Sequence, residues 1–485
     1  MATDDVPPHG KRPELSRVLG PLATLSVIVG SVIGSGIFIV PARVALNIPS
    51  IGGIVLVWII GGVFSLAGAL ALAELAAMLP QAGGPYVYLR EAFGKLPAFL
   101  FGWTEFLVIR SGSVATLAAA CAYNIVLLVP APEGVSHALW LSGWAIAALV
   151  VVATINVLGT SLGGRVQIVG TFLKLGTLLA MIVLPFMLGD AEVARLAPIW
   201  PASFGTDDFL KFMVAMVGVL WTYDGWVNSS ELAEEITDPG RTIPRSLIFG
   251  MAVLISVYLG TTLVYHMVLS MSEMGGIATG ETIVAAVFWE RLLGTPGLTA
   301  ASLAVMFSIL IALNGNALCG PRAYFAMARD GLFPQALCRV HPRFQTPANA
   351  IIAQAIWSIT ILVVGTIPQA WEIPSRFPAM LTTAWHALHE TPLYDILYHY
   401  VIFGGTVIYT LTISSVFVLR RTRPDLPRPY RTWGYPITPL LYVLSSFILM
   451  GSMLASKPSE ALAGVGLILL GVPTYWWFHH RPKTV

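Results

Sequence analysis

Charged residues are scarce in this chain, in which only 11% of the 485 positions are Asp, Glu, Lys or Arg. Soluble domains carry about 25% charged residues, and 56% of this chain is hydrophobic, so the composition indicates a membrane protein. The net charge is only +2, and no Lys/Arg-rich tract with interleaved aromatic residues occurs. Nucleic acid is therefore excluded as a partner.

Cysteine is almost absent as well. Cys121, Cys319 and Cys338 lie in or just after apolar runs and lack the spacing of metal ligands, so we interpret them as packing residues and predict no metal or other cofactor. The first 18 residues are polar and lack the apolar region and small-residue cleavage site of a signal peptide. The first membrane segment is therefore expected to stay attached.

Long apolar runs, in contrast, are abundant. Each is near the ~20 residues that cross a bilayer, and together they predict an all-α polytopic membrane protein surrounded by lipid. A hydropathy reading gives about twelve spans, at 19–44, 52–79, 97–128, 139–158, 163–188, 208–236, 246–271, 297–328, 347–366, 396–420, 436–455 and 459–478.

The distribution of Lys and Arg predicts the orientation. With a cytoplasmic N-terminus, 19 of the 27 Lys and Arg residues fall in inner segments and 6 in outer segments. Because basic residues favour the cytoplasmic side, we expect a multi-pass protein of the cell inner membrane with both termini in the cytoplasm. The proline-containing stretch 367–395 is expected to form a structured outer loop.

The first span contains a candidate helix break at Gly34-Ser35-Gly36-Ile37. Glycine costs a helix about 1 kcal/mol relative to alanine, and unwinding here would expose the amide groups of Ser35, Gly36 and Ile37. Amides at the start of a helix can bind a carboxylate. The alternative is a small-residue face that packs against another helix.

The sixth span contains a second candidate break, where Asp224 and Gly225 follow Trp221 in mid-membrane. Unwinding would free the carbonyls of Trp221 and Asp224 to accept from an ammonium group. Interrupted spans at corresponding places in two halves point to a transporter site. One break offers donors and the other acceptors, which favours α-amino acids over sugars or inorganic ions.

Because the two breaks lie five spans apart, we expect two inverted five-helix repeats followed by two further helices. The expected segments are a cytoplasmic tail at 1–18, the first repeat at 19–188, the second repeat with its outer loop at 208–420, two additional helices at 436–478 and a cytoplasmic tail at 479–485.

Around these residues the chain resembles the amino acid–polyamine–organocation (APC) transporter superfamily, and within it the L-type amino acid transporter branch and its bacterial relatives. The shared motifs cover nearly the whole chain. They are Gly34-Ser35-Gly36-Ile37-Phe38 with Pro41, Gly83-Gly84-Pro85-Tyr86-Val87-Tyr88, Glu231-Leu232-Ala233-Glu234-Glu235 through Asp238-Pro239 to Ile243-Pro244-Arg245, and Pro321-Arg322 through Ala328-Arg329-Asp330-Gly331 to Pro334 and Thr346-Pro347.

The resemblance implies a LeuT-like fold and a substrate site at the two breaks. The substrate carboxylate would meet the amides of Ser35 and Gly36, and its ammonium group the carbonyls of Val32, Trp221 and Asp224. The Trp221 ring would close over the substrate, unless it is simply an interior aromatic. The predicted substrate-binding residues are Val32, Gly34, Ser35, Gly36, Ile37, Trp221, Asp224 and Gly225.

Lys174 lies near the centre of the fifth span, where a lysine must be paired, deprotonated or in contact with water. By the resemblance, it takes the place of a sodium ion and bridges spans one and eight, which argues against sodium coupling. The alternative is a lysine paired with a structural carboxylate such as Glu74 or Glu105.

Three other charged residues lie within the spans. Glu105 and Arg110 are five residues apart, farther than an i,i+4 helical pair, so we expect them to have structural roles without pairing with each other. Glu74 lies near the inner end of its span and is expected to be solvated or to form part of a gate.

Animal L-type transporters use a cysteine between spans three and four to bond an accessory glycoprotein, according to the resemblance. The corresponding loop here, 130–134, has no cysteine. We therefore expect no disulfide-linked accessory subunit.

These features predict sodium-independent transport of neutral L-amino acids by alternating access, as an exchanger or a facilitator. Two transport alternatives stay open. One is a proton-coupled importer that uses Lys174, and the other is a transporter of cationic amino acids or polyamines that uses Asp224. An enzyme is disfavoured because no His-x-x-x-His pair or Gly-x-Ser-x-Gly elbow occurs in a membrane context, and a channel because no filter-like segment appears.

Overall fold

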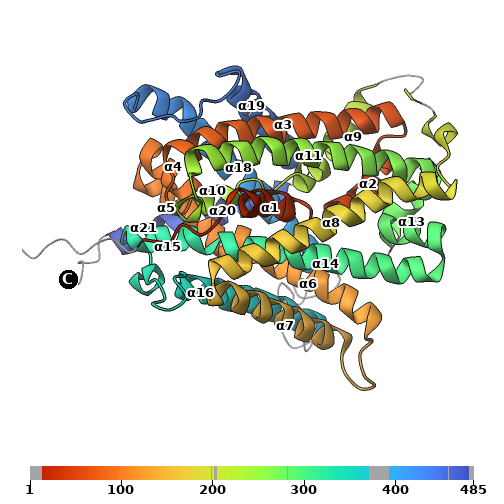
Figure 1. Cartoon of the computed structure of the whole chain (residues 1–485), viewed down its shortest axis with the longest axis horizontal. Helices are drawn as coiled ribbons and strands as arrows, with labels where there is room; N and C mark the ends of the chain where they lie inside the picture. Colours follow the sequence, from red (N-terminus) through yellow and green to blue (C-terminus); the bar gives the residue numbers. More distant parts are fainter. Residues whose placement is uncertain are drawn as a thin grey trace, which may run out of the picture.

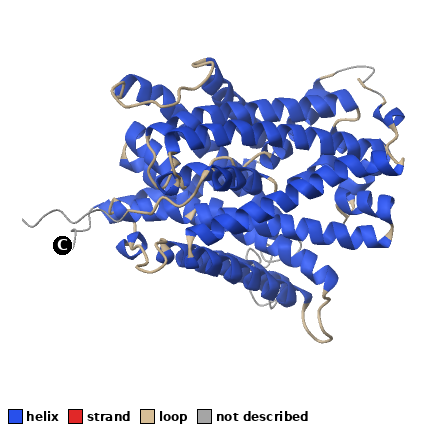
Figure 2. Ribbon diagram, viewed as in Figure 1, coloured by secondary structure: helices blue, strands red, loops and turns tan. Residues whose placement is uncertain are grey.

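The computed structural model describes residues 14–197, 199–200, 205–280, 282–370, 393–456 and 458–479. These residues form helices joined by loops, and the predicted all-α polytopic fold is confirmed (Figures 1 and 2). The helices are α1 (Pro21–Val32), α2 (Gly36–Asn47), α3 (Ile51–Met78), α4 (Pro85–Phe93), α5 (Lys95–Thr104), α6 (Arg110–Leu128), α7 (His137–Leu158), α8 (Thr160–Leu188), α9 (Thr206–Thr222), α10 (Asn228–Glu231), α11 (Pro239–Val268), α12 (Met271–Thr279), α13 (Val284–Leu293), α14 (Thr295–Cys319), α15 (Pro321–Arg329), α16 (Ala348–Ala370), α18 (Leu393–Thr422), α19 (Ile437–Ser456), α20 (Pro458–Leu469) and α21 (Gly471–His479).

Ten helices in the described ranges are long and apolar enough to cross a membrane, and the bent pair α1 and α2 makes an eleventh candidate span. The remaining predicted span, the sixth, corresponds to α9, which has 17 residues and stops at Thr222. Each predicted span thus has a helical counterpart. The predicted outer loop is shorter than expected, since α16 continues to Ala370 and α18 starts at Leu393; residues 371–392 of that loop lie outside the described residues.

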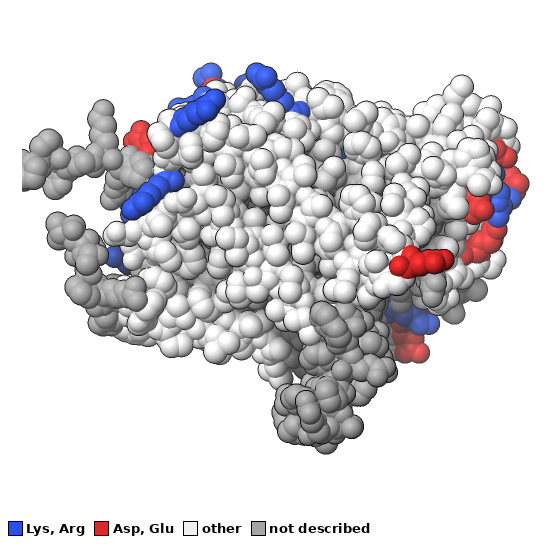
Figure 3. Space-filling view, turned by 90° about the horizontal axis from the view of Figure 1, so that it is seen from below, with Lys and Arg blue, Asp and Glu red and all other residues white. Residues whose placement is uncertain are grey.

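The charges separate toward the two ends of the molecule. On the face shown in Figure 3, Lys and Arg gather mainly at one end, Asp and Glu mainly at the other, and an uncharged band lies between them. Apolar side chains on the long helices are exposed, among them Val169, Phe172 and Phe249. In a membrane such side chains contact lipid, so the exposed band is the expected surface of a multi-pass protein.

Helix α1 lies at the centre of the bundle (Figure 1) and packs against α8, α11 and α14, while α2 packs against α9. The segment before α1 is joined to the segment after α10. The amides of Val18 and Leu19 donate to the Glu235 carbonyl, each at 2.9 Å, and the Thr237 amide donates to the Leu19 carbonyl at 2.9 Å. Leu19 and Ile236 form an isolated parallel β-bridge. Both helices that carry the predicted breaks are therefore connected at the same end.

Glu74 on α3 is buried, so the expectation that it is solvated is wrong, while its role in a gate stays a prediction. Its carboxylate accepts two hydrogen bonds from Arg420 of α18, at 2.8 and 2.6 Å, and two more from the amide and hydroxyl of Thr432, both at 2.7 Å. A buried carboxylate needs such partners. Glu74 therefore joins α3 to α18 and to the loop that follows it.

Candidate functional site

The first predicted break is present. Helix α1 ends at Val32 and α2 begins at Gly36, with a bend of 41° between them. Among the described residues, no hydrogen bond from the amides of Ser35, Gly36 or Ile37 is found. These donors start α2, where the helix dipole favours a negative charge, and they can bind an anion.

The second predicted break is also present. Helix α9 ends at Thr222, and a turn leads to α10. Gly225 in this turn has φ of +116°, in the left-handed region that favours glycine. A Cβ atom there would lie 3.2 Å from both the carbonyl carbon of Ser31 and the amide nitrogen of Val32. The backbone at Gly225 is therefore in direct contact with the backbone at the end of α1, and the two breaks lie next to each other.

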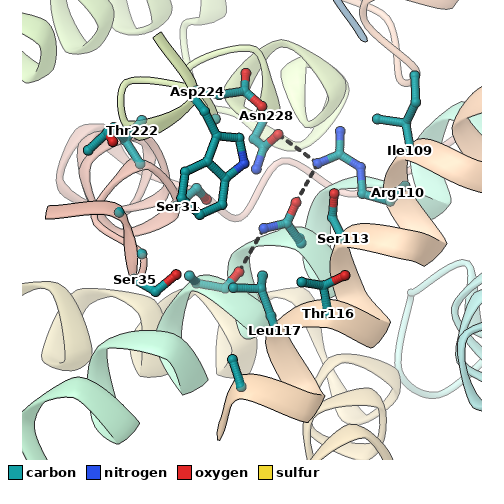
Figure 4. Close-up of a pocket in the computed structure, with 18 of the residues that line it drawn as sticks. Ser31, Ser35, Ile109, Arg110, Ser113, Thr116, Leu117, Thr222, Asp224 and Asn228 are labelled. Atoms are coloured by element: carbon teal, nitrogen blue, oxygen red, sulfur yellow. Dashed lines mark hydrogen bonds between the residues drawn. The ribbon is translucent and has the colours of Figure 1, made fainter. Parts of the chain in front are cut away.

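A cavity of about 90 Å³ lies between the breaks (Figure 4). Its wall includes the predicted site residues Val32, Gly34, Ser35, Gly36, Trp221, Asp224 and Gly225. Ile37 is not in the wall, because its side chain is fully buried in the apolar core. Lys174 is not in the wall either.

The Val32 carbonyl is already occupied in this conformation. It accepts from the Gly34 amide at 2.8 Å and from the Tyr258 hydroxyl at 3.0 Å. A carbonyl oxygen has two lone pairs, so an ammonium group would have to displace one of these donors. The Trp221 carbonyl accepts from the Asp224 amide at 3.1 Å.

Trp221 and Asp224 also line a second cavity of about 70 Å³ between α3, α9, α18 and α19. The two residues, with Ile109 and Tyr409, therefore form the partition between the two cavities. Asp224 is exposed although it lies in the middle of the bundle, which places its accessible surface inside these cavities.

Arg110 is a site residue that the sequence-based prediction omitted. Its guanidinium group lines the cavity and donates to the side-chain oxygens of Asn228 and Asn316, both at 2.8 Å (Figure 4). One of its nitrogens also contacts Glu231 at 2.6 Å and Glu105 at 2.7 Å. All three charged side chains are buried. Two carboxylates thus face one guanidinium beside the cavity.

The prediction that Glu105 and Arg110 do not pair is wrong, and the local backbone explains why. Residues Glu105–Ile109 form a π-helix between α5 and α6. A π-helix closes its hydrogen bonds from i to i+5, so side chains five apart come onto one face. Such single turns occur often at functional sites, and this one directs Arg110 toward the cavity.

Other wall residues were also missed. Ser113, Thr116 and Ala120 on α6 follow Arg110 at helical spacing. This row of polar and small residues could have been recognised in the sequence of the third span. The polar or small wall residues absent from the prediction are Ser31, Ser113, Thr116, Ala120, Thr222, Asn228, Ala312 and Asn316. Of these, the residues on α10 and α14 could be placed only once the helix packing was known.

Lys174 on α8 is 4% exposed and bonds to the backbone at the end of α1. Its Nζ donates to the carbonyls of Gly30, at 2.7 Å, and Ile33. The Ser308 hydroxyl of α14 reaches the same Ile33 carbonyl at 3.3 Å. The alternative of a paired carboxylate is wrong, because Glu74 binds Arg420 and Glu105 contacts Arg110.

Comparisons with known proteins cover almost the whole chain. A family model described as amino acid permease matches residues 19–477. The serine/threonine exchanger SteT of Bacillus subtilis (strain 168) is 27% identical over 475 residues, which span 98% of this chain and 99% of that protein. The b(0,+)-type amino acid transporter 1 of Homo sapiens is 30% identical over 97% of this chain and 89% of its own length. The human cystine/glutamate transporter is 28% identical over 97% and 87%.

Proposed function

This chain belongs to the amino acid permease family, and we propose that it transports neutral L-amino acids across the cell inner membrane without sodium, as an exchanger or a facilitator. The membership agrees with the APC resemblance of its motifs. The relatives named above are amino acid transporters or exchangers, which supports transport and gives no reason to expect an enzyme.

The observation that carries sodium independence is the position of the Lys174 ammonium group. Its bonds to the carbonyls of Gly30 and Ile33 place a fixed cation against the oxygens exposed where α1 ends. Such oxygens are the natural ligands of a sodium ion, because hard cations prefer oxygen donors. A covalently attached cation at these oxygens would replace sodium there, which supports sodium independence.

We expect transport to survive the complete replacement of sodium. Purified protein in proteoliposomes, with choline in place of sodium on both sides, should take up labelled amino acid at an initial rate within about twofold of the rate in sodium. The same liposomes without protein set the background. A large loss of uptake in choline would contradict sodium independence, whatever the substrate.

The substrate orientation follows from the two breaks. The amides of Ser35 and Gly36, which lie in the cavity wall and for which the described residues provide no acceptor, are the donors available for a carboxylate. On the opposite side of the cavity, the Trp221 carbonyl and the Asp224 side chain are acceptors for an ammonium group. A zwitterion satisfies both sides at once, which is why an α-amino acid is the best-fitting solute.

Asp224 supports a second candidate, the transport of cationic amino acids. The positive charge of Arg110 is matched by Glu105 and Glu231, so the Asp224 carboxylate has no basic partner among the described side chains. A cationic side chain could take that place. Competition by arginine against labelled serine distinguishes the candidates: strong competition that is lost in Asp224→Asn would favour cationic substrates.

We expect Trp221→Ala to weaken apparent affinity by about tenfold, or about 1.4 kcal/mol, without abolishing exchange. The substitution keeps the backbone carbonyl and removes the ring that divides the two cavities. Concentration dependence of uptake into proteoliposomes measures the effect. Trp226→Phe alters an aromatic wall of the second cavity alone and should change affinity less. An unchanged affinity in Trp221→Ala would remove the ring from the substrate site.

We also infer that both termini face the cytoplasm and that the transporter works without a disulfide-linked subunit. The excess of Lys and Arg at one end of the molecule supports the orientation (Figure 3). The loop between α6 and α7 has no cysteine. Cys121 and Cys319 are buried within helices, where they cannot reach a partner.

A further inference from the structure

A third cavity lies apart from the two described above, at the end of the bundle where α7 leads into α8. Its volume is about 360 Å³, within the range of small-molecule sites. The wall is formed by the segment before α1, the α7–α8 junction and the loop before α16. Figure 3 shows that basic residues gather at this same end, and nothing in the proposed transport cycle uses the cavity.

The chemistry of the wall is basic. Arg165 and Arg343 line the cavity, and none of the described residues in its wall is acidic. Both arginines are exposed, and the described residues provide no ion pair for either guanidinium; that of Arg343 lies 5.5 Å from the centre of the Phe344 ring. The hydroxyls of Ser16 and Ser161 lie in the same wall. Arginine forks match phosphate oxygens, so the cavity suits a phosphate group.

Exposed apolar side chains surround this basic cavity. Val18, Leu158 and Leu162 line it and are 46%, 46% and 41% exposed. Along α8 toward the middle of the bundle, Val169 and Phe172 are 61% and 59% exposed. A basic pocket that continues into an apolar ridge matches one class of molecule, a phosphate head with hydrocarbon chains. Basic pockets between transmembrane helices bind lipid head groups in this way.

We propose that this cavity binds the phosphate head group of an anionic phospholipid, with its acyl chains along the exposed face of α8. The site is distinct from the substrate cavity and does not depend on which amino acid is carried. Because its wall includes Ser16 and Val18, which precede α1, a bound lipid also contacts the segment that joins the two broken helices.

Binding to the full-length protein in detergent tests the proposal, with short-chain phosphatidylglycerol and phosphatidylcholine as probes. Thermal unfolding should shift upward with phosphatidylglycerol and little with phosphatidylcholine. Each arginine near a lipid phosphate contributes on the order of a fivefold change in binding, so Arg165→Gln/Arg343→Gln should weaken phosphatidylglycerol binding by about tenfold or more. Arg339→Gln changes an exposed arginine outside the cavity wall and is the charge-matched control for each of the single variants Arg165→Gln and Arg343→Gln.

Each possible result either supports or contradicts binding of an anionic phospholipid. Equal shifts with the two lipids, or equal weakening by Arg339→Gln, would overturn it in favour of a general charge effect. Inorganic phosphate or glycerol phosphate that binds as tightly as the lipid would show a soluble-anion site instead. The single variants Arg165→Gln and Arg343→Gln, each with an intermediate loss, keep the test valid if the double variant is unstable. Sodium-independent uptake is measured separately and is not needed for any of these results.

Discussion

Gly36→Val is expected to abolish substrate binding, while Gly143→Ala on α7, outside the cavity wall, leaves it close to wild type. A Cβ atom on Gly36 would lie 2.8 Å from Oγ1 and 2.9 Å from Cγ2 of Thr222. Thr222 cannot easily turn aside, because its hydroxyl donates to the Gly218 carbonyl at 2.8 Å. A Cβ atom on Gly143 meets no atom within 4 Å.

Overpacking of this kind costs about 1–3 kcal/mol in a well-packed core, and here it falls where α2 begins beside α9. A valine also covers the amides that we expect to receive the carboxylate. Scintillation proximity with labelled substrate measures binding, and size-exclusion chromatography verifies that both variants fold. Near-normal binding by Gly36→Val would show that the glycine serves helix packing alone.

Lys174→Ala is expected to slow turnover by about tenfold or more while weakening binding less. The Lys174 ammonium group links α8 to the carbonyls of Gly30 and Ile33 at the end of α1. Leaving buried acceptors unsatisfied costs about 1–3 kcal/mol. That free energy acts on the end of α1, so it changes the balance of outward and inward states, whereas the carboxylate and ammonium positions are retained.

Lys211→Ala provides the control, since Lys211 is an exposed residue near the start of α9 and should leave the rate unchanged. Equilibrium binding and single-turnover exchange separate the two effects. A wild-type turnover in Lys174→Ala would remove this residue from the mechanism. Rates measured between about pH 5 and 8 add a second test: a flat wild-type profile fits exchange or facilitation, and a slope that disappears in Lys174→Ala would favour proton-coupled import.

The helix breaks could be predicted from the sequence because their cause is local. Glycines beside Ser35 and Asp224 weaken a helix wherever they occur in it, and α1 and α9 do end at these places. The Glu105–Arg110 pair could not be predicted, since it depends on a π-helical turn that residue spacing alone does not reveal. The ideal period of an α-helix leads to the opposite conclusion.

Contacts between residues far apart in the chain could not be predicted from the sequence either. The Val32 carbonyl was expected to be open, yet Tyr258 on α11 donates to it, and no pattern near Val32 indicates this neighbour. The position of Lys174 opposite α1 could be predicted from the family resemblance, whereas its Gly30 acceptor depends on how α8 packs on α1.

The backbone bonds between Val18, Leu19 and Glu235 have a mechanical consequence. They connect the segment before α1 to the segment after α10, so a movement of one of these segments is transmitted to the other. These bonds lie on the α1 and α10 sides of the two breaks, so we expect α1 and α10 to move together, while α2 and α9 move relative to them at the breaks.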